Sequence, residues 1–171
     1  MKKVIVVLAS LLISACASTP APKTEAAAAA PAATSADSAK TAAASAAEME
    51  AGKLAAEVQN LQNQSVYFDF DKSVVKAEFQ DVMSKQADFI KSHKNDVVTL
   101  EGNTDERGSS EYNLALGSKR SHAVKTSLKI MGVSEAQMKE ASLGEEKPRQ
   151  TCHEEQCWKE NRRVDFVHQV N

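Results

Sequence analysis

The sequence lacks the features that would cross a membrane as a helix or attract nucleic acid. Its N-terminal apolar run, Val4–Ile13, is ten residues long, about half of the roughly 20 needed to span a bilayer. We therefore expect no permanent transmembrane anchor. Its 21 basic residues do not outnumber its 23 acidic ones. A phosphate-binding surface normally carries a basic excess, so no nucleic-acid partner is expected.

The N-terminus has the three parts of a secretory signal: a basic pair, a short apolar run and small residues at its end. We expect residues 1–15 to be removed, which leaves 19 basic against 23 acidic residues and a net charge of −4. Ile13-Ser14-Ala15-Cys16 resembles the lipobox of bacterial lipoproteins, which predicts a lipidated Cys16. The alternative is an ordinary signal peptide with a chance cysteine. Ala17 is not the Asp that marks inner-membrane retention, so the resemblance indicates the inner leaflet of an outer membrane.

Residues 16–64 have almost nothing to bury, because Ala, Ser, Thr, Pro, Lys and Glu dominate them. Such a segment cannot offset its ordering entropy, so we expect a disordered tether. Part of it, Ala43–Asn63, can form helix transiently, although Gly52 opposes a stable one. The tether would act as a spacer between a membrane surface and a folded domain at residues 65–171.

The folded domain alternates strand-like and helix-like patterns. β-branched and aromatic composition predicts strands at 65–70, 96–101, 139–143 and 162–168. Apolar spacings of three, four and seven predict a helix over 75–90, and a second helix over 110–131 should end at Gly132. This pattern predicts an α/β sandwich, a β-α-β-α-β-β fold with a small mixed sheet and two main helices on one face.

The second helix carries polar residues where it should be apolar. At about 100° per residue, Asn113 and Arg120 point in the same direction as Val124. Two polar groups on a buried stripe are costly unless they find partners. Gly117 lies between them, and we interpret this glycine as keeping space open for a ligand near the helix start, where free N–H groups favour an anion.

The loop before this helix supplies a carboxylate, Asp105. An Asp and an Arg held together suit a ligand with both an ammonium and a carboxylate, as at a free amino-acid end. The alternative is an internal Asp105–Arg120 ion pair that only braces the loop.

These motifs resemble the OmpA-like peptidoglycan-binding domain family. The resemblance covers nearly all of the domain, from Val66 to Val167, and leaves the tether outside. The residues that carry it are Val66-Tyr67-Phe68-Asp69-Phe70-Asp71, Asn103-Thr104-Asp105-Glu106-Arg107-Gly108, Glu111-Tyr112-Asn113, Leu116-Gly117, Arg120, Gly144-Glu145-Glu146-Lys147-Pro148 and Asn161-Arg162-Arg163-Val164.

The resemblance implies non-covalent binding of the peptidoglycan stem peptide through its meso-diaminopimelate, without a cofactor or catalysis. Asp105 is then expected to meet the ammonium and Arg120 the carboxylate. The remaining expected site residues orient the loop, line the wall or reach the rim: Asn113, Thr104, Phe70, Asp71, Leu116 and Arg107. Asn103 occupies a position where many relatives have His. Ser121 replaces a usual Ala, a change expected to be neutral.

The resemblance also implies partners. It predicts a Tol envelope system in which the periplasmic protein TolB competes with peptidoglycan, with a link onward to TolA. The alternative is a lipoprotein that uses the same fold mainly to contact other envelope proteins.

Three further patterns allow more than one interpretation. Asp69, Asp71 and Asp105 could be the paired acids of a glycan hydrolase, but no nucleophile–base arrangement supports that. Cys152 and Cys157 are expected to form a disulfide in an exported protein, against a zinc site that would add His153 and His168. Next to this pair, Trp158 is interpreted as a packing residue. Alternation alone leaves open whether Arg162 and Arg163 reach the site or pair with acidic neighbours.

Overall fold

The computed structural model describes residues 36–170, with side chains from residue 48. The predictions of a signal peptide and of lipidation at Cys16 lie outside the described residues. In chain order the elements are α1 (Ala36–Gln62), β1 (Val66–Tyr67), a 3-10 turn (Ala77–Phe79), α2 (Gln80–Ser92), β2 (Asp96–Asn103), α3 (Ser110–Ile130), a second 3-10 turn (Glu135–Gln137), β3 (Met138–Gly144), α4 (Glu155–Asn161) and β4 (Arg163–Val170).

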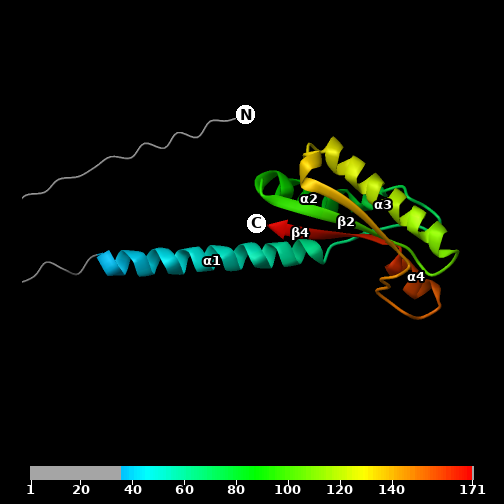
Figure 1. Ribbon diagram of the computed structural model, residues 1–171, viewed down its shortest axis with the longest axis horizontal. Coiled ribbons are helices and arrows are strands. Elements are labelled where there is room, and N and C mark those ends of the chain that lie inside the picture. Colours follow the sequence, from blue (N-terminus) through cyan, green and yellow to red (C-terminus); the bar gives the residue numbers. More distant parts are fainter. Residues whose placement is uncertain (1–35, 171) are drawn as a thin grey trace, which may run out of the picture.

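The four strands form one mixed sheet in the order β1-β4-β2-β3. Strands β2 and β3 are parallel, whereas β4 runs antiparallel to both β1 and β2. Helices α2 and α3 lie together over the sheet (Figure 1), and their apolar side chains share one core with it. The predicted α/β fold class is confirmed. The short helix α4 was not predicted.

The core follows from the two periodicities of the sequence. Along β2, burial alternates so that Val98 and Leu100 face the helices. Met83 and Ile90 from α2, and Leu128 from α3, meet them with none of their surface exposed. Each side chain of this kind stabilises the fold by roughly 1.5–3 kcal/mol through burial. As predicted, α3 ends before Gly132, whose φ of +89° suits glycine.

The predicted disordered tether is wrong for residues 36–62, which form helix α1. Its Ala, Glu, Lys and Leu residues are strong helix formers, and its C-terminal end is fixed to the domain. Leu61 is buried, and its carbonyl accepts a 2.9 Å hydrogen bond from Gln86 Nε2. Gln62 Nε2 donates to the His168 carbonyl at 3.3 Å. The rest of α1 extends away from the sheet (Figure 1). The last turns of α1 therefore pack on the domain: Ala56, Glu57 and Asn60 face Lys85, Asp88 and Phe89 of α2, and Leu61 is buried.

Gly117 has a different role from the predicted one. It does not line a cavity; instead it lets α3 approach β2 and β3 closely. A Cβ built there would lie 2.4 Å from Ser142 Oγ and 2.7 Å from the Gly102 carbonyl oxygen. The two glycines therefore form a contact between helix and sheet backbones. This contact determines how closely the N-terminal half of α3 approaches the ends of the strands. The candidate site lies between these elements.

Candidate ligand-binding site

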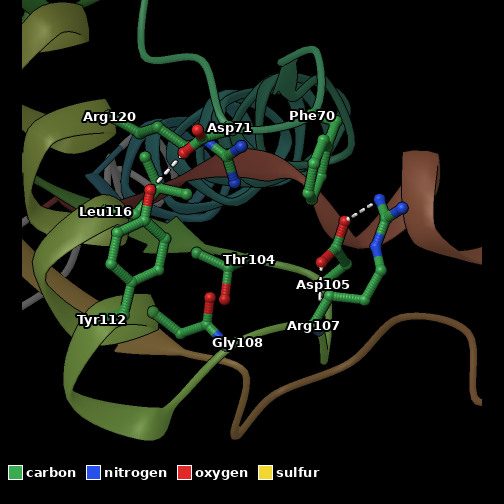
Figure 2. Close-up of a pocket in the computed structure, with 10 residues that line it drawn as sticks. Phe70, Asp71, Thr104, Asp105, Arg107, Gly108, Tyr112, Leu116 and Arg120 are labelled. Carbon is green, nitrogen blue, oxygen red and sulfur yellow. Dashed lines mark hydrogen bonds and ion pairs between the residues drawn. The ribbon is translucent and has the colours of Figure 1, made fainter.

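A cavity of about 170 Å³ lies where the segment after β1, the loop after β2 and the first turns of α3 meet (Figure 2). Its lining contains eight of the nine predicted ligand residues, together with two that were not predicted. The eight are Phe70, Asp71, Thr104, Asp105, Arg107, Asn113, Leu116 and Arg120, and the additional two are Gly108 and Tyr112. Asn113 and Arg120, the two polar residues on the apolar face of α3, therefore line the same cavity.

Arg120 is the buried cation of this cavity. Its side chain is fully buried, and it donates Nε to the Lys72 carbonyl and Nη1 to the Asn103 carbonyl, both at 2.9 Å. Nη2 reaches the Asp69 carbonyl at 3.2 Å. Among residues 48–170 no carboxylate forms an ion pair with Arg120, although the charges of Asp105 and Asp71 lie near enough to favour its cationic form. Burial lowers its pKa to about 10, so it remains a cation at neutral pH.

The guanidinium of Arg120 retains hydrogen-bonding capacity. It has five N–H donors, and three are satisfied by backbone carbonyls. A desolvated positive charge without an anionic partner is costly. The remaining donors therefore favour an incoming anion in the cavity that Arg120 lines.

Asp105 pairs with Arg107 and Arg162, so the alternative of an internal Asp105–Arg120 ion pair is wrong. Its Oδ2 lies 2.7 Å from Arg107 Nη2 and 3.2 Å from Arg162 Nη1, and its Oδ1 accepts the Arg107 backbone N–H at 3.1 Å. Burial alone would raise the pKa of Asp105, but the hydrogen bonds from Arg107 and Arg162 outweigh it and hold the pKa below its ordinary value.

These contacts show which of the two arginines at the start of β4, Arg162 and Arg163, reaches the site. Arg162 reaches the site through Asp105 and also pairs with Glu155 at 2.5 Å. Arg163 instead pairs with Asp165 at 2.9 Å, away from the cavity.

Tyr112 is the functional candidate that sequence reasoning missed. Its hydroxyl donates a hydrogen bond to Asp71, which links the first turn of α3 to the segment after β1 (Figure 2). Asp71 is in the left-handed region, with φ of 57°, which is unusual for a residue other than glycine. The pKa of Tyr112 is raised above its ordinary value, mainly because its hydroxyl bonds the Asp71 carboxylate. Tyr112 is exposed, so no apolar periodicity in the sequence identified it.

Two polar side chains complete the cavity. Thr104 is buried, and its Oγ1 has no hydrogen-bond partner within the described part of the chain. A buried hydroxyl without a partner costs about 1–3 kcal/mol, so Thr104 is well suited to bond a ligand. Asn113 Nδ2 lies 2.5 Å from Glu145 Oε2, which fixes the orientation of its amide.

Asn103 was predicted to belong to the site, but its side chain does not line the cavity. Its Nδ2 donates to the Glu101 carbonyl at 3.0 Å and to Asp165 Oδ2 at 3.4 Å. The pairing of β2 with β3 is irregular between Gly102 and Asn103. Only the Asn103 backbone carbonyl serves the site, as an acceptor for Arg120.

The alternative hydrolase interpretation gains no support from this geometry. A catalytic general acid needs a raised pKa, whereas that of Asp105 is lowered. Asp71 is bonded to a neutral hydroxyl, and Asp69 pairs with Lys76 at 3.2 Å near the surface.

The zinc interpretation of the cysteine pair is wrong. Cys152 and Cys157 form a disulfide, as predicted. His168 is buried elsewhere, with Nδ1 2.7 Å from Asp96 and Nε2 2.8 Å from Gln86. Across the described residues, no three His, Cys, Asp or Glu side chains group in a way that could hold a metal ion.

The contacts of Asp105 predict an acid-dependent loss of stability. The pKa of Asp105 is lower in the folded protein than in the unfolded chain. The ionised carboxylate therefore stabilises the fold fully above the pKa of the unfolded chain, and this stabilisation is lost as the pH falls through the pKa of the folded protein. We expect Asp105→Asn to lower the free energy of unfolding by about 2 kcal/mol at pH 7, with the difference shrinking below about pH 4. Urea titrations at pH 7 and pH 3 measure this. The surface variant Asp88→Asn is the control, and a difference independent of pH would contradict the assignment.

The fold and the cavity define an OmpA-like domain. A model described as the OmpA family matches residues 67–162, more than half of the chain, and the chain therefore belongs to that family.

Within this family the chain is similar to peptidoglycan-associated lipoproteins. The one from Pseudomonas putida is 44% identical over 115 residues, covering 67% of this chain and 69% of the relative. The one from Legionella pneumophila is 33% identical over 166 residues, covering 97% of this chain and 93% of the relative.

A solved structure agrees. The crystal structure of the peptidoglycan-associated lipoprotein from Burkholderia pseudomallei is 50% identical and superposes with a TM-score of 0.61, covering 62% of this chain and 90% of that one. Of the helices within residues 36–170, none combines the length and apolar character needed to cross a membrane.

Proposed function

We propose that this protein is an outer-membrane lipoprotein that binds the meso-diaminopimelate stem peptide of peptidoglycan without covalent attachment. Lipid on Cys16 would hold one end in the membrane, and the domain in the periplasm would hold the cell wall. The observation that carries the proposal is Arg120, a buried cation with spare donors and no carboxylate partner among the described residues, lining a cavity. The names of the relatives support the ligand class.

The chemistry of the cavity suits an amino-acid end with two charged groups. A ligand carboxylate would take the free N–H groups of Arg120, and the Thr104 hydroxyl would supply one more bond. The ligand ammonium would meet Asp105, whose carboxylate has about four acceptor positions and uses three on Arg107 and Arg162. Asp71 would contribute negative charge from the opposite wall (Figure 2).

Selectivity follows from the same geometry. Lysine has the side-chain ammonium of diaminopimelate but lacks its second carboxylate. A lysine-type stem peptide would leave Arg120 buried without an anion. A site built around a buried polar group rejects an analogue that cannot pair with it, commonly by several orders of magnitude.

We further propose that the protein belongs to a Tol–Pal system serving envelope integrity and cell division, with TolB as a competing partner and a link to TolA. The proposal of a competing protein partner is supported by the surface at the opening of the cavity, where Phe70 and Tyr112 are both about half exposed. Exposed aromatic side chains beside polar groups are typical of protein interfaces.

Co-sedimentation with purified sacculi tests the wall-binding proposal. The full-length protein in mild detergent should pellet with sacculi of the diaminopimelate type and stay in the supernatant with sacculi of the lysine type. Free diaminopimelate stem peptide should release it in a concentration-dependent way. Equal pelleting with both types, or no release by the peptide, would contradict the proposal.

A further inference from the structure

A disulfide-closed segment next to the cavity is not used in the function proposed above. We name Cys152–Asn161 the α4 segment. It lies at the end of the domain where α3 begins (Figure 1). Its helix has seven residues, too few to be stable alone in water. The disulfide joins Cys152 to Cys157, five residues apart, and buries Cys157. The disulfide therefore closes the segment on itself, and contacts with the rest of the domain hold the segment in place.

One of these contacts is a stack on Arg107. The guanidinium carbon of Arg107 lies 4.0 Å from the centroid of the Phe70 ring and 4.1 Å from that of Trp158. The cation is thus placed between two aromatic faces, one from the cavity wall and one from α4. Each such cation–π contact contributes about 0.5–1 kcal/mol at an exposed site and more when desolvated. Trp158 was predicted as a packing residue, and what it packs on is a residue of the cavity.

The same indole also holds the neighbouring loop residue. Trp158 Nε1 donates to Glu106 Oε1 at 2.8 Å, and His153 Nδ1 lies 2.7 Å from the same oxygen. Two residues of the α4 segment therefore fix Glu106. Together with the stack, they hold two consecutive residues of the loop between β2 and α3.

The segment also supports Asp105 from its other side. Glu155 pairs with Arg162 at 2.5 Å, and Arg162 reaches Asp105 at 3.2 Å. Arg107, held by Trp158, reaches the same carboxylate at 2.7 Å. Both arginines that orient Asp105 are thus held by side chains of the α4 segment.

We propose that the α4 segment preorganises the ligand site, with Trp158 as a positioning residue that acts through Arg107. The inference rests on the proposed function and deepens it. Without the indole, Arg107 and its loop gain freedom, and a ligand must order them on binding at a cost in affinity. The disulfide also contributes to preorganisation, because it fixes the turn at the start of α4, the helix that carries Trp158.

Calorimetric titration of the full-length protein with a meso-diaminopimelate stem peptide tests the inference. Trp158→Ala should weaken binding about two- to fivefold, the range of one lost cation–π contact at an exposed site. The double variant Cys152→Ser/Cys157→Ser should fall in the same range. Trp158→Phe keeps a ring over Arg107 and should bind nearly as the wild type does. Ile130→Ala, at the exposed far end of α3, is the control and should bind unchanged.

A double-mutant cycle separates positioning from general stability. In an Arg107→Ala background, adding Trp158→Ala should cost much less affinity than it does in the wild type, because Arg107 is gone and only the bond to Glu106 is lost. An equal loss in both backgrounds, unchanged binding by Trp158→Ala, or a loss in Trp158→Phe as large as in Trp158→Ala would each overturn the inference. If the wild type does not bind the peptide, the proposed function fails and the inference falls with it.

Discussion

Arg120→Gln is expected to weaken binding of a meso-diaminopimelate stem peptide about 100-fold or more. Removing one partner of a buried charge pair costs about 2–5 kcal/mol, and each 1.4 kcal/mol is a factor of ten in Kd. Glutamine is neutral, so the ligand carboxylate would enter the cavity without a counter-charge. Arg120→Lys keeps the charge but loses the planar fork of donors, so we expect it to fall between the wild type and Arg120→Gln. Isothermal titration gives the three values.

Stability must be separated from affinity in this series. Arg120→Gln removes donors from the carbonyls of Lys72, Asn103 and Asp69, so some destabilisation is expected as well. Arg163→Gln is the matched control, because Arg163 is also a buried arginine but bonds Asp165 away from the cavity. It should lower Tm and leave Kd unchanged. Binding by Arg120→Gln within threefold of the wild type would show that the ligand carboxylate does not use Arg120.

Gly102→Ala is expected to cause the largest loss of stability. A Cβ at this position would lie 2.0 Å from the Gly117 carbonyl oxygen and 2.6 Å from its carbon. Both atoms are backbone, so α3 must move away from β2. Overpacking of this kind costs about 3 kcal/mol or more, which lowers Tm by about 12 °C in a domain of this size. Thermal unfolding followed by circular dichroism measures the change.

The matched control is Gly52→Ala. Gly52 lies in α1, and a Cβ at this position would have no neighbouring atom within 4 Å, so its replacement should leave the unfolding of the domain unchanged. Because α3 carries Asn113, Leu116 and Arg120 into the cavity, Gly102→Ala should also weaken ligand binding. A Tm within about 2 °C of the wild type would contradict the close contact between helix and sheet.

The sequence predicted the layers of the fold because β2, β4 and α2 are periodic and two-faced, and because β-branched and aromatic composition marks the strands. Alternation along β2 and the spacing of three and four along α2 are visible without any tertiary contact. Helix α4 was missed because seven residues are too few for a periodic signal. Helix α1 was predicted as a tether because its composition offers little to bury, yet local propensity and the contacts of Leu61 and Gln62 make it helical.

The candidate site was predictable where a polar residue interrupts an apolar face, which is how Asn113 and Arg120 were found. The partners of these residues were not predictable. Arg120 bonds carbonyls 48 and 51 residues away in sequence, and Asp105 is shared by Arg107 and Arg162. Such pairings depend on how the loops meet above the strand ends. The Asn103 side chain likewise bonds Glu101 and Asp165 instead of lining the cavity, next to an irregularity in the β2–β3 pairing.

We propose that Arg120 binds a second carboxylate on the ligand. Calorimetric titration of the wild-type full-length protein with two stem peptides, identical except for meso-diaminopimelate or lysine at the third position, tests it most directly. Our account predicts saturable binding of the diaminopimelate peptide and at least about 100-fold weaker binding of the lysine peptide. Equal affinity for both peptides, or no binding of either, would contradict it.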